Sequence, residues 1–196
     1  MVAPKDPLSA APGTGFERGK QNTALQGHVA FFDRDEDGII WPMDTYVGFR
    51  EIKFGVFLSI VSVLVIHLGF SYFTWGSWLP DPFFRLRVNL MHKGKHGSDS
   101  ESYTKSGEFD LERFNQTFEW YTSPPHTHMK FWEGVRMLHG NMNPFDPFGW
   151  SAAIFEWLAT YLMLWPDDPR GMRKEDVKGV YNGSIFYKIS GRKFKQ

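Results

Sequence analysis

Cysteine is absent from this sequence of 196 residues. Its absence excludes disulfide bonds, zinc sites with cysteine ligands and a thiol nucleophile. Net charge is also lacking, with 22 basic and 22 acidic residues, so no global field attracts nucleic acid and electrostatic targeting depends on local clusters. Aromatic residues, in contrast, make up 17% of the chain. This content indicates either a very aromatic core or rings in contact with lipid.

The length predicts one domain of ordinary size with appendages. Residues 1–24 are polar and rich in Pro, Gly and Ala, without the apolar core of a secretory signal, so we expect a flexible, cytosol-facing arm. We divide the remainder into a calcium-binding region at 25–53, an apolar membrane-associating segment with a proline knot at 54–84 and a C-terminal region at 85–196. The predicted fold is mostly α, with an EF-hand-type helix-loop-helix pair, one member metal-binding and one degenerate, an apolar helical segment and a helical C-terminal region.

The most specific motif is the acidic loop DRDEDGIIWPMD. Carboxylates occupy its first, third, fifth and twelfth positions, glycine its sixth, and the seventh offers a backbone carbonyl, which is the EF-hand pattern for calcium. The predicted ligands are Asp33, Asp35, Asp37, the Ile39 carbonyl and Asp44. Because Asp44 is shorter than the usual Glu, we expect magnesium to compete more closely with calcium here. The alternative interpretation is a solvated acidic turn.

EF-hands normally pair, and the stretch SYTKSGEFDLERF is predicted to be the degenerate partner. Gly107 falls at its sixth position and Phe109 at its eighth, with an apolar helix following. The positions that would hold ligands are Ser102, Thr104, Ser106 and Arg113. These side chains do not suit a hard cation, so we expect no metal in this loop.

Residues 54–75, FGVFLSIVSVLVIHLGFSYFTW, form an apolar run near the length needed to cross a bilayer. Its one ionisable residue, His67, is costly at mid-membrane unless it has a partner. Small residues fall on one helical face, in a stripe suited to close helix packing. They are Gly55, Ser59, Ser62 and Gly69. The alternative is a wholly buried core helix.

The sequence WGSWLPDPFFRLRV follows this run. Pro80 and Pro82 end any helix, and the aromatic residues prefer a membrane interface. We expect the basic residues that come next to attract anionic headgroups. They are Arg85, Arg87, Lys93 and Lys95. Because the acidic loop and this basic cluster flank the run and are both expected in the cytosol, a monotopic, hairpin or interfacial embedding is favoured over a simple span.

Seven histidines are present, and one of them has an unusual place. His28 stands five residues ahead of the acidic loop, where a calcium site has no use for an imidazole. His92 and His96 are four apart, a spacing that zinc-binding helices use, but Gly94 weakens a helix there and no third ligand is near in sequence. Zinc is therefore disfavoured. We interpret His126, His128 and His139 as surface or structural residues.

Several motifs in this order together resemble the caleosins, the EF-hand peroxygenases of lipid droplets and the endoplasmic reticulum. They are LQGHVAFFDRDEDGIIWPMDTYVGFR, the apolar run with WLPDPFF, HKGKHGSDSESY, NPFDPFGWSAAIFEW and YNGSIF, and they extend from about Leu25 to Phe186. The short N-terminal arm and a proline knot reduced to Pro80 and Pro82 are more similar to the fungal than to the plant branch.

The resemblance implies one bound Ca²⁺ and a haem b associated with two histidines, which in this sequence are His28 and His96. Without a thiolate, histidine is the natural axial ligand for such a haem. A peroxygenase needs an electron-rich axial ligand on one side and a proton-handling group near the open side. His28 suits the first role, and His96 is either a second ligand or the distal group.

The implied activity is calcium-dependent transfer of oxygen from fatty-acid hydroperoxides to unsaturated fatty acids or other acceptors, by epoxidation, hydroxylation or sulfoxidation. The implied location is the cytosol-facing surface of lipid droplets and the endoplasmic reticulum, with a homo-oligomer left open and no nucleic acid as partner. One rival is a non-catalytic, calcium-binding coat protein of lipid droplets. Another, a soluble EF-hand adaptor, is disfavoured by the apolar run.

Overall fold

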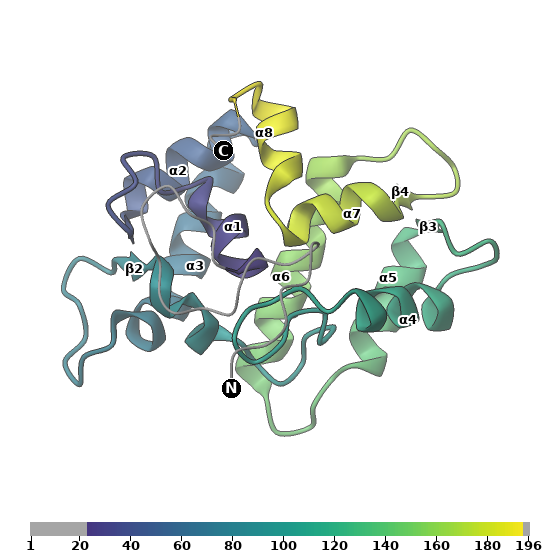
Figure 1. Ribbon diagram of the computed structural model, residues 1–196, viewed down its shortest axis with the longest axis horizontal. Coiled ribbons are helices and arrows are strands. Elements are labelled where there is room, and N and C mark those ends of the chain that lie inside the picture. The colour runs from purple at the N-terminus through teal and green to yellow at the C-terminus, as the bar shows by residue number, and fades with distance from the viewer. Residues whose placement is uncertain (1–22, 194–196) are drawn as a thin grey trace.

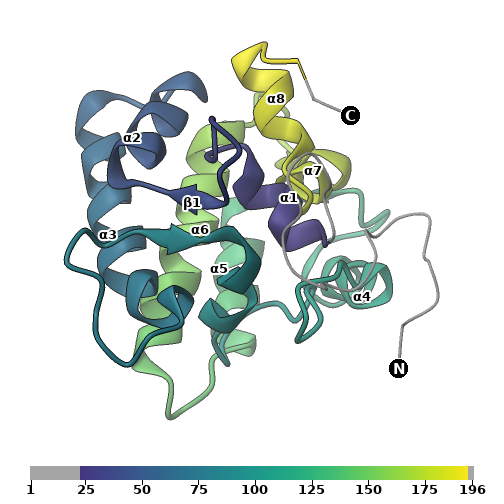
Figure 2. The same cartoon turned by 60° about the vertical axis from the view of Figure 1, so that its left-hand side comes forward.

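The computed structural model describes residues 23–193, so nearly all of the arm expected at residues 1–24 lies outside the described part of the chain. Within that part the fold is mostly α, as predicted (Figures 1 and 2). The elements in order are α1 (Ala24–Ala30), β1 (Ile39–Ile40), α2 (Pro42–Glu51), α3 (Val56–Trp75), β2 (Leu86–Arg87), the 3₁₀ helix η1 (Val88–Gly94), α4 (Leu111–Tyr121), β3 (His128–Met129), α5 (Phe131–Gly140), α6 (Pro147–Leu164), β4 (Met172–Arg173), α7 (Lys174–Tyr181) and α8 (Ser184–Ser190).

Local sequence explains where several helices begin and end. The Thr23 hydroxyl accepts from the Gln26 amide at the start of α1, and the Asp110 carboxylate accepts from the Arg113 amide at the start of α4. Proline at the first position of α2 and of α6 has the φ angle that a helix needs and lacks only an amide that would be unpaired. Gly76 ends α3 in the left-handed conformation, at φ 77°.

The strands join helix-loop-helix units in pairs. β1, between α1 and α2, pairs antiparallel with β2, between α3 and η1, so that Ile40 faces Leu86. β3, between α4 and α5, pairs in the same way with β4, between α6 and α7, so that Met129 faces Met172. All four facing residues are buried. The described chain therefore holds two pairs of units, each joined loop to loop as in an EF-hand pair.

This pairing corrects the predicted position of the degenerate partner. The acidic loop does have a degenerate partner, but it is the loop before β2 rather than the stretch from Ser102 to Arg113. In that stretch Tyr103 and Phe109 form an isolated bridge with each other, and the Gly107 carbonyl accepts from the Leu25 amide of α1. The sequence of the true partner is dominated by the apolar run, which conceals its helix-loop-helix character.

Helix α3 is inverted relative to an ordinary surface helix, in the sense that its polar side chains are buried and its apolar side chains are exposed. Its buried residues are Ser59, Ser62, His67, Ser71 and Thr74. Its exposed residues include Val56, Phe57, Ile60, Leu64, Leu68 and Tyr72. The predicted small-residue stripe is confirmed at the two serines, which lie in the close packing. The alternative of a wholly buried core helix is wrong, because the apolar side of α3 faces outward.

His67 has the partners that its position requires. Its Nδ1 lies 2.6 Å from the Phe84 carbonyl and its Nε2 lies 2.7 Å from the Thr45 hydroxyl. Because a carbonyl can only accept, Nδ1 carries the proton and Nε2 accepts from Thr45. The imidazole thus ties α3 to α2 and to the loop that follows α3.

Helix α6 connects two hydrophobic clusters. The first cluster is built from α1, α2, β2, η1 and α8, and the second mainly from α4, α5, the β3–β4 pair and α7. Phe155 and Met163 of α6 pack against the first cluster, while Trp157 and Tyr161 pack against the second. Figure 1 shows α6 between the two groups of helices. Side chains from both parts can therefore meet around this helix.

Candidate functional site

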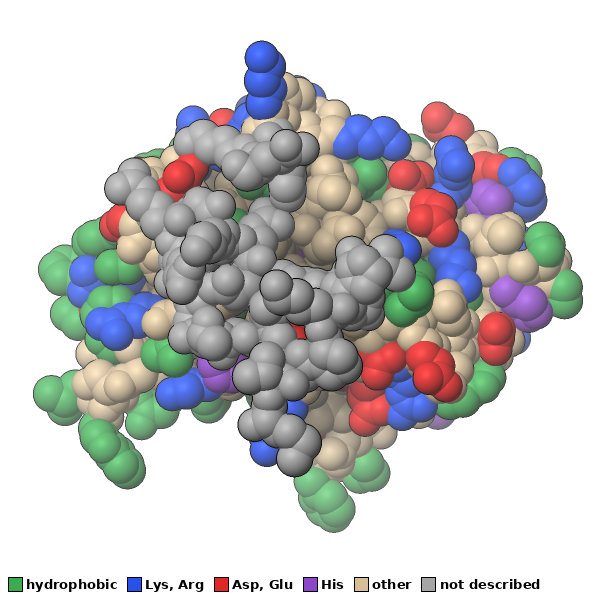
Figure 3. All heavy atoms as spheres, in the orientation of Figure 1, with side chains coloured by type: hydrophobic (Ala, Val, Ile, Leu, Met, Phe, Trp, Pro, Cys, Tyr) green, Lys and Arg blue, Asp and Glu red, His purple; other side chains and the backbone are tan. Residues whose placement is uncertain are grey.

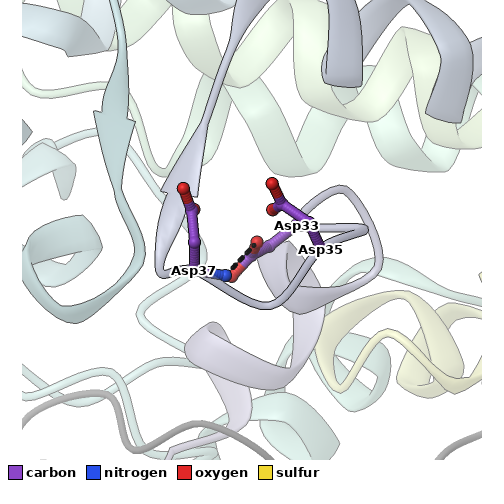
Figure 4. Close-up of side chains that lie close together, drawn as sticks. All are labelled: Asp33, Asp35 and Asp37. Atoms are coloured by element: carbon purple, nitrogen blue, oxygen red, sulfur yellow. Dashed lines mark hydrogen bonds between the residues drawn. The ribbon is translucent and has the colours of Figure 1, made fainter.

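The acidic loop brings three of its predicted ligands together. Oxygens of Asp33, Asp35 and Asp37 lie within 4.8 Å of one another (Figure 4). The Asp33 carboxylate also accepts from the amides of Asp37 at 3.2 Å and Gly38 at 2.9 Å. Gly38 has φ 83°, a conformation that favours glycine. The backbone therefore holds the first carboxylate where an EF-hand ligand belongs.

Electrostatics make this cluster a candidate cation site. Asp33 is buried, and its burial, together with the nearby carboxylates of Asp37 and Asp35, raises its pKa to about 6 against the hydrogen bond from Gly38. A divalent cation would relieve that repulsion. Asp44 stands apart from the group of three, and one of its oxygens accepts from the Trp41 amide at 2.9 Å. The Ile39 carbonyl and Asp44 remain predicted ligands.

The partner loop, which precedes β2, has an arginine beside its buried carboxylate. Asp81 is buried like Asp33, and its carboxylate accepts from the amide of Arg85 at 2.7 Å and from two guanidinium nitrogens of the same arginine at 2.9 and 3.0 Å. Arg85 lowers the pKa of Asp81. Each loop of this pair thus holds a buried aspartate that accepts from the backbone amide four residues later, but in the second loop a guanidinium neutralises the carboxylate.

Two of the four basic residues that were predicted to attract lipid headgroups make contacts inside the protein. Arg85 also stacks on Trp41 and Trp75, at 4.8 and 4.3 Å from the ring centroids. The Lys95 ammonium donates to the Tyr103 carbonyl and pairs with Asp99 at 3.4 Å. These two cations therefore already have partners inside the protein, and their attraction to anionic headgroups stays a prediction.

Both predicted histidines line one cavity of about 250 Å³. His28 comes from α1, and His96 from the loop after η1, 68 positions later in the numbering. Most of the wall is apolar, with side chains from α3 and α6 such as Phe70, Ala153 and Met163. The fold therefore brings together two residues that only the family resemblance had joined.

His28 has the environment of a neutral metal ligand. Its Nδ1 lies 2.6 Å from the Val180 carbonyl, so Nδ1 donates and Nε2 keeps its lone pair. Burial lowers its pKa, and the contacts with Val180 and Glu156 offset only part of that effect. Metal-bound histidines typically donate their second ring N–H to a carbonyl or carboxylate in this way. His28 could thus hold an iron through Nε2.

The turn between α7 and α8 supports His28, which explains the YNGSIF motif. Gly183 has φ 77°, and a Cβ there would lie 2.5 Å from the Gly27 carbonyl and 2.9 Å from the His28 Cα. Only glycine allows this close approach. Phe186 packs edge-on against the imidazole, with ring centroids 5.0 Å apart. Sequence reasoning noticed the motif but not this supporting role.

His96 has a different environment. Its Nε2 lies 3.8 Å from a carboxylate oxygen of Glu156, and its Nδ1 is buried without a hydrogen-bond partner among the described residues. Burial lowers its pKa, but Glu156, with Asp99 and Asp146, outweighs burial and leaves the pKa raised. Its side chain is 5% exposed, whereas that of Glu156 is 51% exposed. The pair can hold or move a proton at the cavity wall.

Two sequence motifs hold the His96 loop together. Ser98, two residues beyond His96, donates to the Asp146 carboxylate at 2.9 Å and accepts from the Asn143 amide at 3.2 Å. Asp146 also accepts from the Gly149 amide at 2.8 Å at the start of α6. The KHGSD and NPFDPFGW motifs therefore form one hydrogen-bonded unit behind the cavity.

A polar patch completes the wall. Tyr181 OH lies 2.6 Å from Ser100 Oγ, which donates to Ser102 Oγ at 3.0 Å, and Tyr103 OH donates to the Tyr181 carbonyl. Burial raises the pKa of Tyr181 to about 12 and also raises that of Tyr103. Both phenols are therefore neutral donors at pH 7. Sequence analysis missed these residues and Glu156, although the hydroxyl-rich run SDSESY was a signal for the serines.

The alternative of a zinc site gains nothing from the structure. Among the described residues, the three aspartates of the acidic loop are the one group of three or more His, Asp or Glu placed to share a metal ion. His92 and His96 thus remain without a third zinc ligand there.

The chain is similar to a known family and to named proteins. A family model described as "Caleosin related protein" matches residues 20–190. A "Peroxygenase" from Lilium longiflorum is 37% identical over 188 residues, which cover 96% of this chain and 78% of that protein. A "Probable peroxygenase 4" from Arabidopsis thaliana is 37% identical over 174 residues, which cover 87% of each.

A third relative has a name with a different implication. A "Probable inactive peroxygenase-like protein" from Arabidopsis thaliana is 26% identical over 155 residues, which cover 74% of this chain and 69% of that protein. No solved structure matches the chain.

Proposed function

The chain belongs to the caleosin family, and from this membership we propose that it is a calcium-dependent haem peroxygenase. The reaction takes one oxygen atom from a fatty-acid hydroperoxide, which leaves as the alcohol, and adds that atom to an unsaturated fatty acid or another acceptor. The observation that carries the proposal is the single apolar cavity into which His28 and His96 both open.

The donor chemistry of the cavity fits a haem b. His28 keeps a neutral Nε2 available while Nδ1 donates to the Val180 carbonyl, and no thiolate competes because the chain has no cysteine. Apolar side chains line most of the wall, which suits a porphyrin. When bound, the haem supplies the chemistry that cleaves the O–O bond. His28 is the residue that would hold its iron through Nε2.

His96 and Glu156 are assigned to proton handling. The raised pKa of His96 favours its holding a proton in the presence of Glu156. In its neutral form the imidazole would accept the hydroperoxide proton, and the resulting imidazolium, which the raised pKa favours, would return that proton to the alkoxide that leaves as the alcohol. For this role His96 needs to be near the substrate oxygen rather than bound to iron. The half-exposed Glu156 carboxylate holds the imidazolium, and its contact with water provides proton exchange.

The lining of the cavity suits a fatty acyl substrate. Aliphatic and aromatic side chains exclude water, while the Ser100–Tyr181 pair provides hydroxyls at one part of the wall. A neutral phenol that is already hydrogen-bonded orients a polar headgroup without adding charge. Unsaturated fatty acids and their hydroperoxides therefore remain the proposed substrates.

Association with lipid droplets is supported by the inverted helix α3. This helix is long and apolar enough to cross a membrane, and its apolar side is exposed. The strands β1 and β2, which precede and follow α3 in the chain, are hydrogen-bonded to each other, so the two flanks stay together. This favours a monotopic position on one lipid surface over a span. Apolar side chains project along the left and lower edges of the face shown in Figure 3.

The test is an absorption spectrum of the purified protein with and without calcium, followed by hydroperoxide-dependent epoxidation of an unsaturated fatty acid. We expect a Soret band and oxygen transfer that weaken when calcium is removed. A protein that binds calcium and floats with lipid droplets, but binds no added haem, would instead be the non-catalytic coat protein. The relative named inactive makes this distinction necessary.

A further inference from the structure

Two apolar side chains are almost wholly exposed, and they lie on different loops. Trp78, in the loop after α3, is 93% exposed, and Phe145, in the loop before α6, is 94% exposed. An isolated exposed ring has no role in folding, since it removes no apolar surface from water. The first ring belongs to the apolar segment already assigned to lipid. The second lies more than sixty positions later in the chain.

The loop that carries Phe145 is held in a defined shape. The Phe145 amide donates to the Asn143 side chain at 3.2 Å, and the Trp150 indole donates to the Asn143 carbonyl at 2.7 Å. Asp146 accepts from both Ser98 and Gly149. These four hydrogen bonds fix the loop on both sides of the exposed ring. The ring is therefore held outward before any binding, and binding costs little additional ordering entropy.

This loop is continuous with the exposed side of α3. Phe148 packs edge-on against Phe70 of α3, with ring centroids 5.5 Å apart, and lies 5.8 Å from Phe73. Along α6, Ile154 and Leu158 continue the apolar surface and are about half exposed. Figures 1 and 2 both show α3 and α6 side by side.

Charge identifies the kind of partner. From residue 137 to residue 169 the sequence contains neither Lys nor Arg, so this loop and α6 themselves contribute no basic side chain for anionic headgroups. Phe145 lies at the tip of the loop beside Pro144, Met142 and aliphatic side chains. Such a tip suits the interfacial region of a lipid layer that carries no net charge.

We propose that loop 141–146 and the outer side of α6 form a second lipid-contacting element, which inserts Phe145 into the same lipid surface as α3 and Trp78. The inference rests on the proposed association with lipid and extends it to a part of the chain outside the apolar segment. Because Asp146 also holds Ser98, the inserted loop is directly bonded to the segment that carries His96.

The absence of cysteine permits a site-specific test on the full chain. Phe145→Cys, Trp78→Cys and, as a control on the exposed side of α4, Glu119→Cys are each labelled with an environment-sensitive fluorophore. Each protein is mixed with phosphatidylcholine-coated triolein droplets, and emission, iodide quenching and quenching by nitroxide lipids are measured. We expect a blue shift and nitroxide quenching at positions 145 and 78 but not at 119, with no loss at high salt.

A second variant measures the effect on binding. Phe145→Ser should lower partition onto these droplets roughly tenfold or more, whereas Trp120→Ser, which alters an exposed ring on α4, should leave it unchanged. Because Phe145 is so exposed, its replacement should not change the circular dichroism or calcium binding, and both are checked.

The outcomes separate the two proposals. Insertion at 78 but not at 145 would overturn the second element and leave lipid association intact. Insertion at neither position would overturn both. A blue shift at 145 without lipid that grows with protein concentration would assign the loop to contact between two copies of the chain, against the inference.

Discussion

The two walls of the cavity that carry His28 and His96 place the same side chain in opposite electrostatic environments. His28 lies on a helix, bonds to a backbone carbonyl, and has its pKa lowered by burial. His96 lies on a loop beside Glu156, and the surrounding carboxylates raise its pKa. Burial on one wall favours a neutral imidazole with a free lone pair, and the carboxylates on the other favour a protonated imidazole. In the proposed function, this difference in backbone contacts and charge separates the histidine that would hold the haem from the histidine that would move a proton.

The largest expected effect is on the His28 wall. His28→Gly removes the proposed ligand and should abolish haem retention and all oxygen transfer, because no other histidine of residues 23–193 faces the cavity with its second nitrogen on a carbonyl. Added imidazole should restore part of the Soret band, since it can occupy the vacated space. His139→Ala, which changes an exposed histidine of α5, is the control. Full haem in His28→Gly without imidazole would refute the assignment.

His96→Ala should separate the two walls. If His96 moves protons, haem content stays near that of the wild type while turnover falls by roughly 10²–10⁴. Haem stoichiometry and single-turnover oxygen transfer are measured on the same sample. A loss of haem equal to that in His28→Gly would show that both histidines are ligands and that the contrast between the walls is incorrect.

Glu156→Gln tests whether the charge of Glu156 controls the proton on His96. The variant keeps the shape of the side chain but removes the charge that holds the His96 proton, so turnover should fall by about tenfold with little change in haem affinity. The pH profile should shift as well, with activity lost at a lower pH on the basic side. An unchanged profile would argue that Glu156 has no part in proton handling.

Gly183→Ala tests the support behind His28. A Cβ at this position meets the α1 backbone and also requires φ 77°, so we expect a loss of roughly 1–3 kcal/mol in unfolding free energy and weaker haem binding. Gly191→Ala, with φ 75° and open space around it, imposes the backbone strain alone. Denaturant unfolding and haem titration compare the two variants. Equal haem affinity in both would show that the close approach at Gly183 does not support His28.

Substitutions in the calcium loop should have the smallest effect on haem binding and oxygen transfer in the cavity. Saturating calcium at about 100 times its dissociation constant should stabilise the wild type by about 2.7 kcal/mol, and Asp33→Asn should lose this. Asp44→Glu should tighten calcium binding relative to magnesium. Asp168→Asn, in the loop before β4, where Arg170 already neutralises the carboxylate, should leave calcium binding unaltered. Calorimetry that shows no heat for either ion would exclude the site.

Sequence alone predicted the mostly helical class, the acidic loop and the apolar helix, because each depends on local spacing. It also singled out His28 and His96, through resemblance to a family, and the structure places both at one cavity; their roles stay predictions. It could not locate the β1–β2 pairing, since the partner strand follows an apolar run that disguises its unit. It could not show that Arg85 and Lys95 also have internal partners, because Asp81 and the Tyr103 carbonyl reach these side chains only when the chain folds.

Glu156 and the tyrosines were missed for a related reason. Glu156 lies in an apolar helix sixty residues after His96, and nothing in the spacing marks it as a partner. Tyr181 reaches Ser100 across 81 positions of sequence. Such contacts depend on how α6 and α7 pack, which periodicity does not specify.

Transfer of oxygen from a hydroperoxide in the cavity between His28 and His96 is the core of the proposed function. The most direct measurement uses haem-loaded protein, a fatty-acid hydroperoxide labelled with heavy oxygen in the peroxide group, and an unsaturated fatty acid as acceptor. The account predicts that the epoxide carries one labelled oxygen, that an equal amount of alcohol forms, and that His28→Gly yields neither product. Epoxide oxygen derived from water or dioxygen, or no epoxide from fully haem-loaded wild type, would contradict it.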